Sequence, residues 1–156
     1  MMPYTISQFV ASFVGTVAFV CLFGVQRKYY FFCGLIGGVG WILYYLLTRF
    51  SDIPEVINVL MATMLITLLS RMISVWMRCP VTVFLIAGIF PLVPGAGIYW
   101  TAYYLVTNQT AQAQTSGFAA LKVAIAIVIG IVIILEIPHK FFHLLEKRHD
   151  KQNTDL

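Results

Sequence analysis

Two prolines and two glycines interrupt an apolar stretch of this sequence within eight residues. The run FPLVPGAG occupies positions 90–97, inside the apolar stretch 81–107. Proline removes a backbone donor and glycine permits non-helical torsions, so the run predicts a broken helix. Non-helical backbone at membrane depth is tolerated only where it is buried in protein or lines a cavity. In transporters, the helix ends at such breaks face the bound substrate. We therefore expect Pro91, Pro94, Gly95 and Gly97 to shape a binding site.

A helix that restarts near Gly97 would turn its free N–H groups and the positive end of its dipole toward the break. A small substrate that carries a carboxylate is the expected occupant of such a site. Tyr99 and Tyr103 are four residues apart and share a helix face, so Tyr99 is predicted to donate a phenolic hydrogen bond there. The alternative is an aromatic belt at the outer membrane interface, which fits Tyr103 and Tyr104 better than Tyr99.

A second group of polar residues falls within the apolar segment 55–77. At about 100° per residue these side chains occupy one quadrant of a helix. An arginine in mid-bilayer costs at least about 2.5 kcal/mol, so this quadrant is not expected to face lipid. Either it lines a substrate path, or its hydroxyls bond to neighbouring helices while the arginine reaches the inner surface. The group is Thr63, Thr67, Ser70, Arg71 and Ser74, of which Thr67, Ser70 and Arg71 are the predicted substrate contacts.

The composition determines the class of protein that must position these residues. Of 156 residues, 60% are hydrophobic and 10% are charged, and the mean hydropathy is +0.89. Soluble domains carry roughly 25% charged residues. The chain is therefore predicted to be an all-α integral membrane protein with a single membrane domain.

Five apolar segments are expected to span the membrane, and the fourth of them is the broken one. They are 5–25, 29–47, 55–77, 81–107 and 118–137. We divide the chain into a transmembrane domain, residues 1–138, and a cytoplasmic basic tail, residues 139–156. The part of the tail from His139 to Arg148 is amphipathic, which predicts a short interfacial helix on anionic lipid.

The lysines and arginines predict the orientation of the chain in the membrane. With the N-terminus outside, the cytoplasmic segments hold Arg27, Lys28, Arg78, Lys140, Lys147, Arg148 and Lys151, and the external segments hold Arg49. The positive-inside rule therefore predicts an external N-terminus and a cytoplasmic C-terminus. A re-entrant hairpin at 81–107 would contradict this charge count. A broken crossing helix is favoured, because the stretch is long enough to span with its centre unwound.

Small residues at helical spacing predict close contacts between helices. Gly34 and Gly38 form a GxxxG pattern in the second segment, and Ala126 and Gly130 repeat the spacing in the fifth. Catalysis is not expected, because the sequence shows no nucleophile–base pair, metal-ligand set or phosphate-binding loop. We therefore predict no enzyme activity, no catalytic residues, no cofactor and no metal. The net charge of +4 comes mostly from the tail, so nucleic-acid binding is not expected either.

Several blocks of the sequence point to a known family: CGLIGGVGWILYYLL at 33–47, CPVTVF at 79–84 followed by IFPLVPG at 89–95, and Tyr99. In these blocks the sequence resembles the threonine/serine exporter (ThrE) family, and in particular its small YjjB-like subunits. The proline–glycine core with a tyrosine downstream is its most specific part. The similarity extends over roughly residues 5 to 137.

This resemblance implies a five-span unit that works beside a larger companion membrane subunit with a cytoplasmic hydrolase-like region. Family members are associated with export of threonine and serine, and YjjB-like pairs with the dicarboxylate succinate. The implied function is the membrane subunit of a two-component exporter in the plasma (inner) membrane of a prokaryote, working by alternating access around the broken helix. The alternative is a non-transporting assembly or scaffold subunit, and a homo-oligomer is left open.

Overall fold

The structure is a computed structural model that describes residues 2–51 and 53–137, and each regular element in these ranges is a helix. The long helices are α1 (Met2–Leu22), α2 (Tyr30–Phe50), α3 (Glu55–Met77) and α6 (Thr110–Leu135). The shorter helices are α4 (Val81–Ile89) and α5 (Gly95–Val106), and the 3-10 turns are η1 (Arg27–Tyr29) and η2 (Phe90–Leu92). The predicted interfacial helix in the tail lies outside the described residues.

Four of these helices, α1, α2, α3 and α6, are long and apolar enough to cross a membrane. A fifth candidate is the pair Val81–Leu92 and Gly95–Val106, whose two halves are bent by 57°. The prediction of an all-α membrane protein is therefore confirmed, and so is the break in the fourth apolar segment.

The start of the last helix differs from the prediction. The helix begins at Thr110, whereas the apolar pattern placed its start near Phe118. The residues from 110 to 117 include several alanines and glutamines, which favour helix although they lower the local hydropathy. The connection between α5 and α6 is therefore short, and it turns at Asn108, which has a positive φ of 57°.

The GxxxG pattern of α2 brings α1 and α2 into close contact, as predicted. A Cβ atom added to Gly34 would lie 2.8 Å from the side chains of Phe13 and Val17, and one added to Gly38 would lie 2.7 Å from Phe9. These distances are shorter than van der Waals contact. Only glycine at these positions permits this approach of the two backbones.

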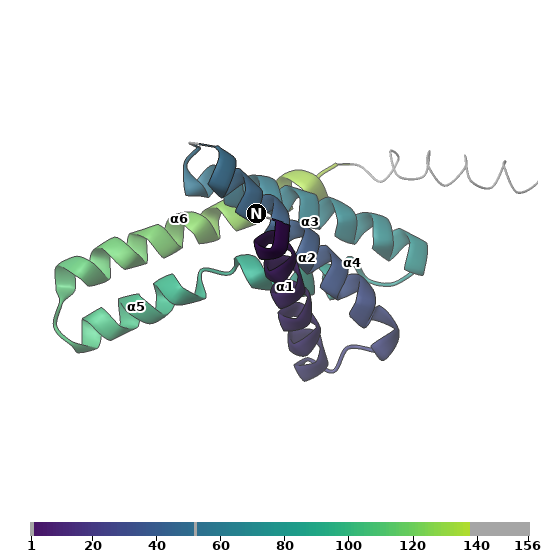
Figure 1. Ribbon diagram of the computed structural model, residues 1–156, viewed down its shortest axis with the longest axis horizontal. Helices are drawn as coiled ribbons and strands as arrows, with labels where there is room; N and C mark the ends of the chain where they lie inside the picture. The colour runs from purple at the N-terminus through teal and green to yellow at the C-terminus, as the bar shows by residue number, and fades with distance from the viewer. Residues whose placement is uncertain (1, 52, 138–156) are drawn as a thin grey trace, which may run out of the picture.

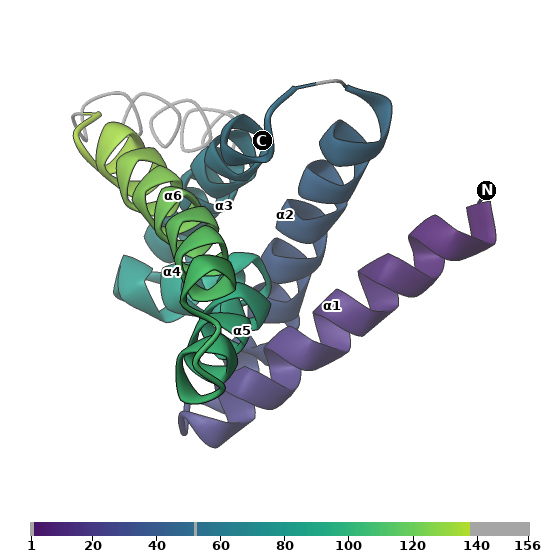
Figure 2. The same ribbon diagram turned by 90° about the vertical axis from the view of Figure 1, so that its left-hand side faces the viewer.

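Helices α3 and α6 pack against each other and run in the same direction. Gly130 of α6 faces Thr63 of α3, and further along both helices Arg71 meets the carbonyl groups of Ile134 and Leu135. Figure 2 shows the two helices side by side. The small-residue spacing of α6 is thus confirmed as a helix contact, since Ala126 is also buried.

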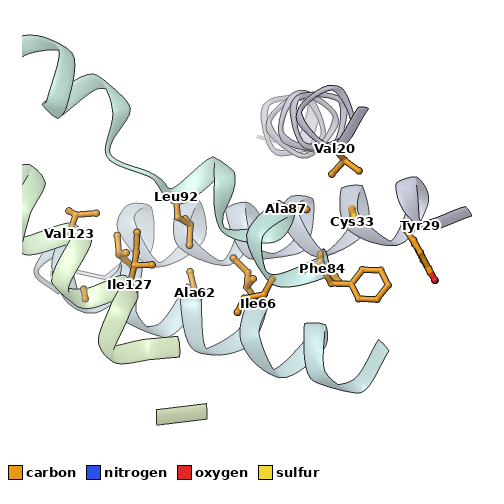
Figure 3. Close-up of a cluster of buried hydrophobic side chains, with 14 residues drawn as sticks. Val20, Tyr29, Cys33, Ala62, Ile66, Phe84, Ala87, Leu92, Val123 and Ile127 are labelled. Carbon is orange, nitrogen blue, oxygen red and sulfur yellow. The ribbon is translucent and has the colours of Figure 1, made fainter. Parts of the chain in front are cut away.

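The apolar core lies where α2, α3, α4 and α6 meet, with one contribution from α1 (Figure 3). Phe84 and Ile66 are fully buried at its centre. Leu92, in the η2 turn, points into the same core near Val123, so the broken segment is anchored by its own apolar side chain.

In contrast, α5 packs chiefly against the first half of α6 and has no buried residue. The two helices form a hairpin that extends to the left in Figure 1, away from α1, α2 and α4. The Pro–Gly break therefore lies where the hairpin leaves the core.

Candidate functional site

The backbone at the break packs against the core through the η2 turn, and a pocket lies beside it. After α4 the chain makes the η2 turn, closed by a hydrogen bond of 3.3 Å from Val93 N–H to Phe90 O. Helix α5 then begins at Gly95, whose N–H donates to Val93 O at 2.7 Å. The ring of Phe90 stacks on Phe19 of α1 with centroids 4.0 Å apart, which fixes the turn against the first helix.

A pocket of about 160 Å³ opens beside this break. The break supplies one wall, which includes the predicted site residues Pro91, Pro94 and Gly95. Helices α2, α3 and α6 supply the rest, namely Trp41, Tyr44, Glu55, Val59 and Val123. Pockets for drug-sized ligands begin at about 300 Å³, so this one suits a smaller molecule.

The polar groups of the pocket come from α2 and α3. The hydroxyl of Tyr44 donates a hydrogen bond to Glu55 Oε1 at 3.1 Å. Glu55 is the first residue of α3, where a carboxylate also interacts favourably with the positive end of the helix dipole. Along the described chain, Glu55 is the one charged residue that lines this pocket.

A second hollow, of about 240 Å³, lies on the other side of Trp41 and Pro91, which line both. Its wall on α1 includes Gln8, Ser12 and Thr16. The indole N–H of Trp41 donates to Gln8 Oε1 at 3.0 Å. Trp41 and Pro91 therefore form the shared boundary between the two hollows, and Pro91 belongs to the break.

The two predicted site residues that lie further along α5, Gly97 and Tyr99, are away from the pocket. Gly97 faces α6, where an added Cβ would lie 3.0 Å from the Cβ of Ala120. Tyr99 is 62% exposed and belongs to a group of aromatic rings on α5, with Trp100 at 5.3 Å and Tyr103 at 6.5 Å between centroids. Neither lines the pocket at the break.

The polar quadrant of α3 is closed rather than open. Thr63, Thr67 and Ser70 are fully buried, and α3 packs here against the apolar and small residues of α6. The hydroxyl of Thr67 donates to Thr63 O at 2.8 Å. Among the described residues, the hydroxyls of Thr63 and Ser70 have no hydrogen-bond partner.

Arg71 lies at the far end of the same quadrant and is 4% exposed. Its Nη1 donates hydrogen bonds to the carbonyl oxygens of Ile134 and Leu135, the last residues of α6. A guanidinium at this position complements the negative end of the α6 dipole. The structure thus brings Thr67, Ser70 and Arg71 together along the α3–α6 contact, apart from the pocket at the break.

The segment from residue 8 to residue 137 matches the family model described as Threonine/Serine exporter, ThrE. The chain belongs to the threonine/serine exporter family. The matched segment contains all residues that line the two hollows, as well as Arg71. The comparison with curated proteins gave no match, and neither did the comparison with solved structures.

For this member of the threonine/serine exporter family, sequence reasoning missed the three residues of the pocket whose side chains carry polar groups. Trp41 and Tyr44 stand in the second apolar segment without a distinguishing pattern, and Glu55 was interpreted only as the end of a span. One signal was available: Glu55 directly follows Pro54 and opens a helix. Its proximity to the break depends on how α3 and α4 pack.

Proposed function

We propose that this chain is one membrane subunit of a two-component exporter of threonine, serine or a small dicarboxylate such as succinate. Export proceeds by alternating access around the break between α4 and α5. The observation that supports this most directly is the pocket at the break, where three other helices contribute lining residues. A crossing helix that is broken beside a pocket is the arrangement in which transporters hold substrates near the middle of the membrane.

The course of the helices supports a single crossing by the broken pair. Because α3 and α6 are parallel, the chain between them must return to the side from which α3 started. Helices α4 and α5 make up that return path. The bend between them is 57°, which is less than a right angle, so α5 continues toward the same side as α4. Five crossings agree with an external N-terminus and a cytoplasmic C-terminus, the orientation that the positive-inside rule favours.

The closed contact between α3 and α6 supports the proposal that α6 moves relative to α3 during transport. A buried hydroxyl without a hydrogen-bond partner lowers the stability of the fold by about 1–3 kcal/mol. Thr63 and Ser70 both have such a hydroxyl on the polar quadrant of α3. Separation of α6 from α3 would let water or substrate reach these hydroxyls. We therefore assign the closed contact to one state of the transport cycle. In another state α6 has moved away from α3, and the polar quadrant of α3 lines the substrate path.

The companion subunit is proposed from the family resemblance and the odd number of crossings. A larger partner of the same type with reversed orientation would give the complex inverted halves, as in many transporters. The exposed apolar surface of α5 is available for such a contact, since none of its residues is buried in this chain.

Efflux from proteoliposomes tests the proposal. Labelled threonine, serine and succinate are loaded into vesicles that hold this chain alone, the companion alone, or both. Export of at least one substrate only with both proteins is the expected result. A verified complex that exports none of them would contradict the carrier function and favour the scaffold subunit.

A further inference from the structure

We infer that Glu55 is the binding group for the amino group of the substrate, so that the pocket selects α-amino acids over dicarboxylates. The inference rests on the proposed function and assigns a role to a residue that lines the pocket at the break. It follows from the charge that the pocket presents, from the bond between Tyr44 and Glu55, and from the helix end opposite them.

The first observation is the sign of the charge. Within the described residues, the lining of this pocket carries one formal charge, the carboxylate of Glu55. The side chain of Glu55 is exposed, so a cation can reach its carboxylate from solvent and is held there by a charge-assisted hydrogen bond. The ammonium group of an amino acid is a cation of suitable size and can donate three hydrogen bonds.

The second observation is that Glu55 is held in position. Tyr44 donates its hydroxyl to Oε1 at 3.1 Å, which leaves the other carboxylate oxygen for a ligand. Trp41 lies one turn before Tyr44 on α2, lines the same pocket and contacts the Tyr44 ring at 5.3 Å between centroids. The carboxylate is therefore oriented by a neighbour before any substrate arrives, and a preoriented group loses less entropy on binding.

The third observation concerns the opposite wall. Pro94, Gly95 and Ala96 line the pocket and form the start of α5. Pro94 has no N–H group and the N–H of Gly95 donates to Val93 O, so Ala96 supplies the first available N–H on this wall. The positive end of the α5 dipole lies at the same place and favours an anion. The pocket thus presents a negative side chain on one wall and a positive helix end on the other.

A zwitterion matches this pair of charges, and a dicarboxylate does not. Threonine and serine would place the carboxylate at the start of α5 and the ammonium group at Glu55. Succinate would place its second carboxylate near Glu55, and two like charges at short range disfavour each other. Glu55 is therefore a specificity-determining residue.

The experiment compares Glu55→Gln with the wild-type chain in the reconstituted complex. The glutamine keeps the size of the side chain and removes its charge. We expect the KM for threonine and serine efflux to rise by about tenfold or more, because a hydrogen bond to a charged group is lost. The KM for succinate is expected to stay the same or fall. Glu55→Asp, which keeps the charge, is expected to recover part of the amino-acid transport.

Two controls separate this role from a structural one. Glu136→Gln removes a carboxylate at the exposed end of α6, outside the pocket, and should leave all KM values unchanged. Competition by glycerate, which carries a hydroxyl where serine has its amino group, gives a second readout. The wild type should prefer serine strongly over glycerate, and Glu55→Gln should lose most of this preference.

The outcomes also separate this inference from the proposed function. If the wild-type complex exports amino acids and Glu55→Gln keeps both the KM values and the preference for serine, the assignment of Glu55 is wrong while the exporter stands. If the wild-type complex transports succinate with lower KM than serine, the selectivity inferred here is overturned. If the wild-type complex exports none of the three substrates, the carrier function itself fails.

Discussion

At the residue scale, neighbouring glycines at the start of α5 have different surroundings. An added Cβ at Gly97 would lie 3.0 Å from the Cβ of Ala120, whereas nothing lies within 4 Å of one at Gly95. Gly95 lines the pocket and Gly97 permits the contact between α5 and α6. The same residue type therefore serves the pocket at one position and the fold of the hairpin at the other.

Substitution by valine should separate these two roles. Gly97→Val should lower the stability of the purified protein by about 1–3 kcal/mol, because it forces α5 away from α6. Gly95→Val should leave stability nearly unchanged and reduce transport, because the added side chain narrows the pocket. Thermal unfolding in detergent and efflux from proteoliposomes measure the two effects. Equal stability losses in both variants would contradict the difference in surroundings.

Arg71 is the other residue whose role follows from its contacts. Arg71→Met should remove the hydrogen bonds to Ile134 and Leu135 and destabilise the chain by about 2 kcal/mol or more, because the carbonyls at the end of α6 lose a charged donor. Arg71→Lys should restore part of the loss. Thermal unfolding in detergent is the measurement. If Arg71→Met kept full stability and lost only transport, direct contact with substrate would be the better explanation.

At the element scale, two helix contacts have similar geometry and different expected behaviour. An added Cβ at Gly130 would lie 3.0 Å from the Cβ of Thr63, across the contact between α3 and α6. An added Cβ at Gly37 would lie 3.1 Å from the Cβ of Thr16, across the contact between α1 and α2. The distance between the two Cβ atoms in a disulfide is at least about 3.5 Å. Both pairs are within a few tenths of an ångström of this distance.

Disulfide crosslinks can therefore test which contact opens during transport. In a background without the native cysteines, oxidation of Thr63→Cys/Gly130→Cys should stop export, and reduction should restore it. The matched pair Thr16→Cys/Gly37→Cys should crosslink as readily and keep most of its export. Gel mobility confirms the crosslinks, and efflux reports the outcome. Undiminished export with the α3–α6 pair crosslinked would show that this contact stays closed throughout the cycle.

At the scale of the whole molecule, the broken pair decides on which sides of the membrane the chain ends. Parallel packing of α3 with α6 requires the chain to cross back between them, and in the proposed topology α4 with α5 provides that crossing. A re-entrant loop would return the chain to its starting side and would make the two helices antiparallel.

Labelling with a membrane-impermeant thiol reagent tests this topology. Single cysteines at Ser51 and Asn108 should react in intact cells, because both positions are expected outside. The native Cys79, beside Arg78, should react only after the membrane is permeabilised. Reaction at Asn108 only in permeabilised cells would contradict a crossing by the broken pair.

The sequence by itself determined the class of fold, the break and the close helix contacts. Few charges and long apolar segments leave helices as the available spanning structure in this chain. Pro91 and Pro94 between α4 and α5, with Gly95 at the start of α5, interrupt a helix for local reasons. Gly34, Gly38 and Gly130 allow backbones to approach. These are properties of short segments, so they can be inferred without knowledge of the rest of the chain.

Only the tertiary structure decided what lies beside the break. Tyr44 and Glu55 come from two other helices, and they meet Pro94 because α2, α3 and the broken segment share one core. Tyr99 and Gly97 are close to the break in sequence but face away from the pocket, since a helix turns its side chains in all directions. Whether a polar residue lines a pocket or a helix contact depends on long-range packing, which the hydropathy pattern does not encode.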